Sequence, residues 1–281
     1  MRAISMTFFQ RFEIRYSLVA ISLIVIVFNI LLAIFAPVIV PHDPNDVSLE
    51  RKLMPSNSDY LLGTDHLGRC VMSRLIYGAR VSLGAAFAVM SVTLSVSAVV
   101  GAVAGYIGGR LDAIIMRICD IFLAFPNLIL ALALVGVMGP GLPNVVLALA
   151  LSQWAWYARM IRGMVLSLKE RNYVLAAKVA GTRQATIIVK HILPNIFPQI
   201  AVLATLDVGW VILNIAGMSF LGLGIQPPTP EWGAMINDGR QFLRGYPSLM
   251  AYPGFMILSV VMSFNLLGDA LRDMVDSKGK Q

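Results

Sequence analysis

Six apolar stretches, each long enough to cross a bilayer, dominate this 281-residue sequence. A hydrocarbon core about 30 Å thick is crossed by roughly 20 residues of helix. The chain is 58% hydrophobic and only 13% charged, whereas a soluble domain averages about 25% charged residues. One water-soluble core cannot bury that much apolar surface. We therefore predict an all-α membrane protein with six spans, near Leu18–Val40, Val81–Tyr106, Ile114–Met138, Leu142–Met160, Ile196–Met218 and Leu249–Gly268.

The basic residues predict the orientation of these spans. Arg2, Arg11 and Arg15 precede the first apolar stretch, which is longer than the roughly 7–15 apolar residues of a cleaved signal peptide, so we expect it to remain a membrane helix. Of the 22 Lys and Arg residues, 15 fall on the side that holds both termini and 7 on the other. The positive-inside rule then places both termini in the cytoplasm. Orientation explains the net charge of +7 better than nucleic-acid binding does.

The spans divide the chain into regions with different expected roles. Residues 1–40 hold an N-terminal cytoplasmic segment and the first span, and residues 41–80 form an external loop. Residues 81–268 form the core membrane domain, which includes a basic cytoplasmic loop at 161–195, and residues 269–281 form a cytoplasmic tail.

The cytoplasmic loop contains a short helical pattern. Apolar residues recur at helical spacing between Tyr173 and Ala180, Gly181 is placed as a C-terminal stop, and Pro194 marks the boundary to the fifth span. A partly apolar helix facing water has two explanations. It lies on lipid headgroups, with its basic residues on phosphates, or it docks into a groove on a cytoplasmic protein.

The same loop resembles a known family. Ala176-Ala177, Gly181 and Leu193-Pro194 resemble the signature of permeases of ABC importers, although Leu175 stands where that signature opens with Glu. Three further stretches resemble motifs of the dipeptide, oligopeptide and nickel permease group: Leu62–Arg69, Ser219–Gly233 and Asn265–Asp273. The resemblance covers nearly the whole chain.

This resemblance implies a fold, a mechanism and partners. The fold would be that of type I ABC importer permeases, and the chain would form half of a pore that works by alternating access. The implied partners are a second homologous permease, two cytoplasmic ATP-binding subunits, an extracytoplasmic substrate-binding protein and membrane lipid. The implied coupling contacts to the ATPase are Tyr173, Ala176, Ala177 and Gly181. The implied location is the bacterial inner membrane.

Three residues near the fifth span are candidates for the pore or its gate: Asp207, Met218 and Phe220. A carboxylate inside a span is expensive and faces a cavity or a partner. For Asp207 we favour pairing with a neighbouring helix, while a polar point on the substrate path remains the alternative.

The external motif also supplies Gly63, Asp65, His66 and Arg69. A carboxylate beside an imidazole could bind a metal, but no further ligand nearby completes a coordination shell. We therefore expect a structural role, with no metal site and no cofactor.

The sequence contains neither a P-loop ending in Gly-Lys-Ser/Thr nor a clustered nucleophile and base, so we expect no ATPase and no other catalytic activity in this chain.

The cargo is the least constrained property. Gln153–Met160, Leu203–Gly209 and Ala216–Phe220 resemble nickel-import permeases, which favours nickel or a nickel chelate. Dipeptide and oligopeptide permeases share most remaining motifs and form the alternative. An ion-coupled secondary transporter would need ionisable residues deep in several spans, and only Asp207 is central.

Overall fold

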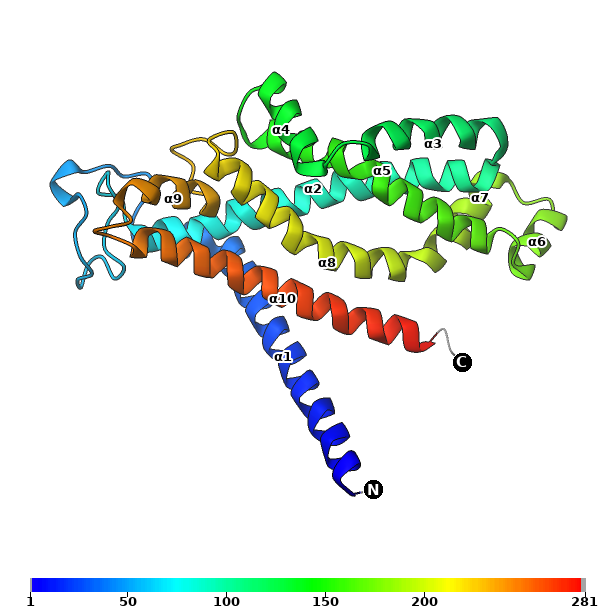
Figure 1. The fold of residues 1–281 in the computed structure, drawn as a ribbon, viewed down its shortest axis with the longest axis horizontal. Coiled ribbons are helices and arrows are strands. Elements are labelled where there is room, and N and C mark those ends of the chain that lie inside the picture. Colours follow the sequence, from blue (N-terminus) through cyan, green and yellow to red (C-terminus); the bar gives the residue numbers. More distant parts are fainter. Residues whose placement is uncertain (1, 279–281) are drawn as a thin grey trace. The chain divides into compact units, whose positions relative to one another are not determined.

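The computed structural model describes residues 2–278, with side chains for residues 17–274. These residues form helices joined by loops, with an isolated bridge between Thr64 and Cys70 (Figure 1). The longer helices are α1 (Arg2–Ile39), α2 (Val71–Ile107), α3 (Gly109–Leu123), α4 (Asn127–Met138), α5 (Leu142–Leu168), α8 (Leu193–Phe220) and α10 (Ser248–Lys278). The shorter elements are η1 (Leu49–Arg51), α6 (Asn172–Val179), α7 (Gln184–Ile187), the π turn η2 (Ile188–Ile192), α9 (Trp232–Gly239) and η3 (Arg240–Phe242).

The all-helical prediction is confirmed, and among the described residues length and hydropathy single out four helices that can cross a membrane. They are Ser17–Ile39, Val71–Ile107, Gln184–Phe220 and Ser248–Met274, with mean hydropathy between 1.7 and 3.1. The helix that contains Pro194 begins at Leu193 and continues a helical run from Gln184. The predicted boundary at Pro194 is therefore a π turn within one span rather than a break. The orientation of the termini stays a prediction, and Lys280 lies outside the described residues.

The predicted third span corresponds to two helices with a sharp bend between them. Helices α3 and α4 pass the same test only as a pair, and they are bent by 86° at the break between them. Pro126 is the N-cap residue of α4. Because the residue before a proline disfavours the α conformation, the chain leaves the helix at this point. Counted as one span, the pair brings the number to five.

The predicted fourth span lies in α5, which extends beyond Met160 to Leu168. This helix is not among those that are apolar enough to cross a membrane by composition. Gln153, Arg159 and Arg162 lie along it. A count of six spans therefore stays a prediction, and α5 is the helix in question.

The chain forms two compact units, of which the first comprises residues 1–86, 140–142 and 205–281. In this unit α1 crosses α10, and the two helices diverge toward the chain termini (Figure 1). The second half of α8 packs closely on α10, because a Cβ atom placed on Gly268 would come within 2.5 Å of the Leu206 side chain.

The second unit comprises residues 87–139 and 143–204. Here α2 packs against α5 through a row of small residues spaced one helical turn apart: Ser97, Gly101 and Gly105. The Ser97 hydroxyl donates to the carbonyl of Trp154 at 2.8 Å, and a Cβ on Gly101 would lie 2.5 Å from the carbonyl oxygen of Ala158. Gly105 repeats this approach one turn later against Arg162. Small residues every fourth position thus let the two backbones touch.

Candidate functional site

The loop between α1 and α2, residues 40–70, is held in a defined shape by hydrogen bonds of its own backbone. The amide of Ser48 donates to the carbonyl of Leu67 at 3.1 Å, and that of Leu53 donates to the carbonyl of Asp65 at 3.0 Å. Gly63, one of the predicted motif residues, is buried with φ +72°. The loop is therefore a folded element that presents the motif from a fixed backbone.

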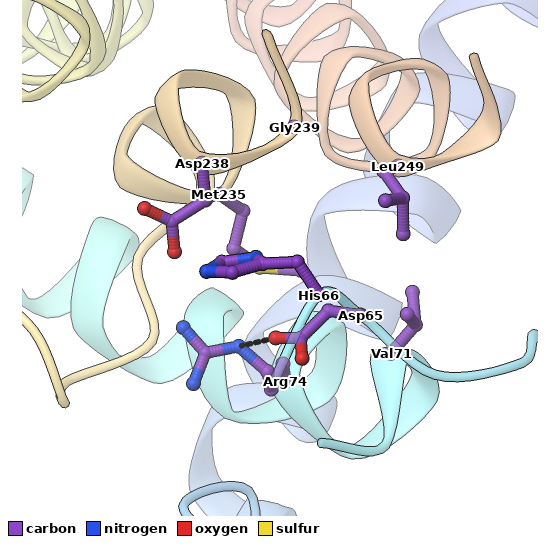
Figure 2. Close-up of a pocket in the computed structure, with 8 residues that line it drawn as sticks. All are labelled: Asp65, His66, Val71, Arg74, Met235, Asp238, Gly239 and Leu249. Atoms are coloured by element: carbon purple, nitrogen blue, oxygen red, sulfur yellow. Dashed lines mark ion pairs between the residues drawn. The ribbon is translucent and has the colours of Figure 1, made fainter. Parts of the chain in front are cut away.

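The charged motif residues are buried and paired with one another. The Arg69 Nε atom lies 2.6 Å from Asp65 Oδ2, and its Nη2 atom lies 3.3 Å from Asp238 Oδ2 of α9. Arg74 Nε lies 3.6 Å from the same Asp65 oxygen (Figure 2). Both arginine side chains are only 2% exposed. Two guanidinium groups and two carboxylates thus balance in charge, as burial of ions requires.

Arg74 also links separate stretches of backbone. Its Nη1 atom donates to the carbonyl of Pro44 at 3.1 Å and to that of Pro228 at 3.3 Å. The residue therefore joins the start of the loop between α1 and α2 to the segment that leads into α9. We call residues 40–74, which are the loop after α1 and the first turn of α2, together with Gln226–Gly239 the loop–α9 assembly.

His66 lies at the edge of this assembly. Its ring stacks on Phe242 with centroids 5.4 Å apart, and its Nδ1 atom is buried without a hydrogen-bond partner among the described residues. Figure 2 shows the imidazole between Arg74 and the α9 residues Met235 and Asp238. The cavity here measures about 20 Å³, room for a single water. No three His, Cys, Asp or Glu side chains in the described part of the chain come together to hold a metal ion.

Helix α9 begins on a buried carboxylate. Glu231, 1% exposed, accepts hydrogen bonds from the amides of Gly233 and Ala234 and from the Ser82 hydroxyl. Trp232 is fully buried and donates to the carbonyl of Leu75 at 3.1 Å. The sequence alone did not predict roles for Arg74, Glu231, Trp232 or Asp238. The available signal was that Glu231 and Trp232 lie within the Ser219–Gly233 motif, because Glu is not among the residues preferred at a helix N-cap.

The predicted cytoplasmic helix exists as α6, and it has an inner and an outer side. Val174 is fully buried in a cluster with Tyr106, Ile161, Val165 and Ile187, and Ala177 packs against that cluster. The opposite side is exposed and apolar: Tyr173 is 41%, Leu175 43% and Val179 90% exposed. Of the predicted contacts, Tyr173 and Ala176 therefore lie outward and Ala177 lies inward.

Gly181 ends α6 as the sequence predicts. Its φ is +74°, the amide of Thr182 donates to the carbonyl of Ala177 at 3.1 Å, and that of Gly181 donates to the carbonyl of Lys178 at 3.0 Å. This bonding pattern is a Schellman motif, which favours glycine because its central residue is left-handed. A Cβ on Gly181 would meet nothing within 4 Å. The requirement for glycine is thus one of backbone conformation.

The three candidates for the pore or gate lie in α8 with different environments. Asp207 is partly buried and is not without a partner, and its pairing with a neighbouring helix stays a prediction. Met218 is fully buried, and Phe220 is partly covered by the Arg240 guanidinium, 5.5 Å from its ring centroid. Neither of these two side chains is fully open to solvent in this structure.

The sequence matches two family descriptions. "Binding-protein-dependent transport system inner membrane component" matches residues 97–281. "N-terminal TM domain of oligopeptide transport permease C" matches residues 14–56.

Similar proteins agree with these matches. A nickel transport system permease protein of Escherichia coli (strain K12) is 46% identical over 273 residues, 96% of this chain and 97% of that protein. A dipeptide transport system permease protein of Alkalihalophilus pseudofirmus is 42% identical over 263 residues, 94% of this chain and 86% of that protein. A metal-staphylopine import system permease protein of Staphylococcus aureus (strain NCTC 8325 / PS 47) is 42% identical over 258 residues, 92% of this chain and 89% of that protein.

A solved structure shares the fold. A chain of the MetNI methionine ABC transporter, in an inward-facing conformation, matches with a TM-score of 0.58 and 21% identity, covering 72% of this chain and 96% of that one. The long apolar helices, the family match and the full-length relatives lead to one conclusion. The chain belongs to the family of binding-protein-dependent transport system inner membrane components and is a permease subunit of an ABC importer in the inner membrane.

Proposed function

We propose that this permease forms half of a translocation pore and is driven through α6 by a separate ATP-binding subunit. The observation that carries the proposal is the two-sided character of α6. Val174 anchors the helix in a core cluster, while Tyr173, Leu175 and Val179 are exposed. Exposed apolar side chains clustered on one face are typical of a protein contact.

The anchoring of α6 suits it to transmit force. Lys178 lies over the Tyr106 ring at 5.2 Å, and the Lys169 ammonium donates to the carbonyl of Gly105 at 3.4 Å. Both contacts reach the end of α2, which is part of a candidate span. A pull on α6 would thus reach that span directly. Lipid contact, the alternative for this helix, would leave no such mechanical role.

The proposed transporter contains separate subunits for energy supply, for the pore and for cargo delivery. Without a P-loop the chain does not hydrolyse ATP, so two ATP-binding subunits supply the energy. A second homologous permease completes the pore, and an extracytoplasmic binding protein delivers the cargo. We propose that residues 41–80 face outward, that 161–195 and 269–281 face the cytoplasm, and that 81–268 form the moving core. Asp207, Met218 and Phe220 remain the proposed pore or gate residues.

The proposed cargo is nickel or a nickel chelate. The support is the nickel permease relative at 46% identity, together with the resemblance of Gln153–Met160, Leu203–Gly209 and Ala216–Phe220. The dipeptide permease relative at 42% identity supports a peptide cargo as the alternative.

Substitution of Gly181 tests the coupling role. We expect Gly181→Asp to abolish ATP-driven uptake while the protein stays in the membrane, because it brings a charge to the proposed contact and touches no span. Gly181→Asn is the matched control, since Asn has the same shape, tolerates the left-handed conformation and carries no charge. Uptake of radioactive nickel and of a labelled dipeptide is measured side by side, with membrane level and ATPase association in the same cells.

Three results would contradict parts of the proposal. Normal uptake by Gly181→Asp would remove α6 as the coupling element. Loss of both variants from the membrane would show that Gly181 serves folding alone. Accumulation of the dipeptide without nickel would select the alternative cargo.

A further inference from the structure

Two ion pairs join α3 to α5 in the second unit. Arg162 binds Asp112 through two atoms, with Nη2 2.6 Å from Oδ2. Arg159 binds Asp120 through a direct contact between side chains, and Arg117 lies 3.8 Å from the same carboxylate. The two helices pack closely between these pairs, since Cys119 is buried with Ala155 and Ala158.

The Arg159–Asp120 pair lies farther from the start of α3 and from the end of α5 than the Arg162–Asp112 pair does, and it is the more exposed of the two. Asp120 stands 11 residues after the start of α3 at Gly109, which is about 16 Å at 1.5 Å per residue. Arg159 stands nine residues before the end of α5 at Leu168, or about 14 Å. Yet Arg159 and Asp120 are 46% and 47% exposed, against 28% and 15% for Arg162 and Asp112. Arg117 is 82% exposed.

Lipid is a poor neighbour for these three side chains. A charge within the hydrocarbon region is costly and almost always faces a water-filled cavity or the interior of a bundle. The nearer the charge lies to the centre, the larger this cost. Helix α5, which carries Arg159, also lacks the apolar composition of a lipid-facing span. The same surface therefore fits water far better than acyl chains.

We propose that Arg117, Asp120 and Arg159 line the aqueous translocation path and contact anionic groups of the cargo as it passes. The inference rests on the proposed function, in which this chain forms half of the pore. With two guanidinium groups and one carboxylate, the cluster carries a net charge of +1. It attracts a carboxylate on a metal chelate or on a peptide and repels a bare divalent cation.

Cysteine labelling in the assembled transporter tests whether the cluster meets water. In a chain with Cys70→Ala and Cys119→Ala, both buried positions, we expect Arg117→Cys to react with a membrane-impermeant methanethiosulfonate reagent. Ile24→Cys is the control, because Ile24 is 67% exposed on the most apolar span. That control should react only with a lipid-soluble maleimide.

Charge substitution tests the contact with cargo. Because Arg117 is so exposed, its replacement should leave folding intact. We expect Arg117→Glu to lower uptake of the transported probe, either a labelled dipeptide or radioactive nickel supplied with a carboxylate chelator, by at least about tenfold, the scale of a charge–charge contact near a protein surface. Arg117→Lys, which keeps the charge, should retain most uptake. Equal uptake by the two variants would overturn the assignment to cargo.

The remaining outcomes separate this inference from the proposed function. Reaction of Arg117→Cys only with the maleimide would place the cluster against lipid. Reaction with neither reagent would place it under another subunit. Either result overturns the inference while ATP-driven uptake by the unsubstituted transporter leaves the proposed function intact. Absence of ATP-driven uptake in that transporter would reject the proposed function itself.

Discussion

Charged residues occur in two regions of this protein, and their surroundings differ. In the loop–α9 assembly Arg69 and Arg74 are each 2% exposed, and they are satisfied by carboxylates and backbone carbonyls. On α3 and α5 the charges of Arg117, Asp120 and Arg159 are 46% to 82% exposed. Removing one partner of a buried pair strands the other charge, whereas an exposed pair is stabilised little by its contact. The first region is thus built for stability, and the second leaves its charges available to other molecules.

The largest expected effect comes from removing the shared carboxylate of the buried region. Asp65→Ala leaves the buried guanidinium groups of Arg69 and Arg74 with Asp238 as their one remaining carboxylate, and we expect it to lower the free energy of unfolding by about 3–5 kcal/mol. The measurements are membrane level and thermal unfolding in detergent. The control Asp46→Ala removes a pair in which that side chain is 54% exposed and should cost about 0–1 kcal/mol. Equal stability of the two variants would show that the buried ion pairs stabilise the protein no more than an exposed pair does.

A smaller loss of stability is expected where two helices pack closely without any charged residue at the contact. Gly101→Ala places a Cβ atom 2.5 Å from the carbonyl oxygen of Ala158, so α2 and α5 must separate. We expect a loss of about 1–3 kcal/mol in the free energy of unfolding. Gly163→Ala, on α5 but facing open space, should be neutral or should stabilise by up to about 1 kcal/mol. A stable Gly101→Ala protein would show that this helix contact is loose.

The smallest expected effect concerns the start of α9. Glu231→Gln keeps the shape and one acceptor oxygen, but it replaces the other acceptor that binds a helix amide. We expect a loss of about 1–2 kcal/mol in the free energy of unfolding, the scale of one unsatisfied buried group. Glu50→Gln, at an exposed position of η1, should cause no change in the same unfolding assay. An unchanged Glu231→Gln protein would mean that the cap contributes little to the assembly.

The candidate sites divide according to how far apart in the sequence their partners lie. Gly181 was identified as the end of a helix because capping depends on neighbouring residues. Asp65 and Arg69 were recognised as a motif, and they are four residues apart. Asp238 was missed because it joins Arg69 across 169 residues. No local pattern reports such a pairing.

The sequence by itself determined that this is a helical membrane protein, because runs of apolar residues have no other stable environment. It also located the short helix α6 and the family motifs, which are local in the chain. Only the tertiary structure decided that α3 and α4 bend by 86° and that α6 has a buried and an exposed side. It alone showed that the Arg159–Asp120 pair is more exposed than the Arg162–Asp112 pair. The exposure of a side chain depends on which helices pack together. Such packing brings together residues that are far apart in the sequence, and no local sequence pattern predicts those contacts.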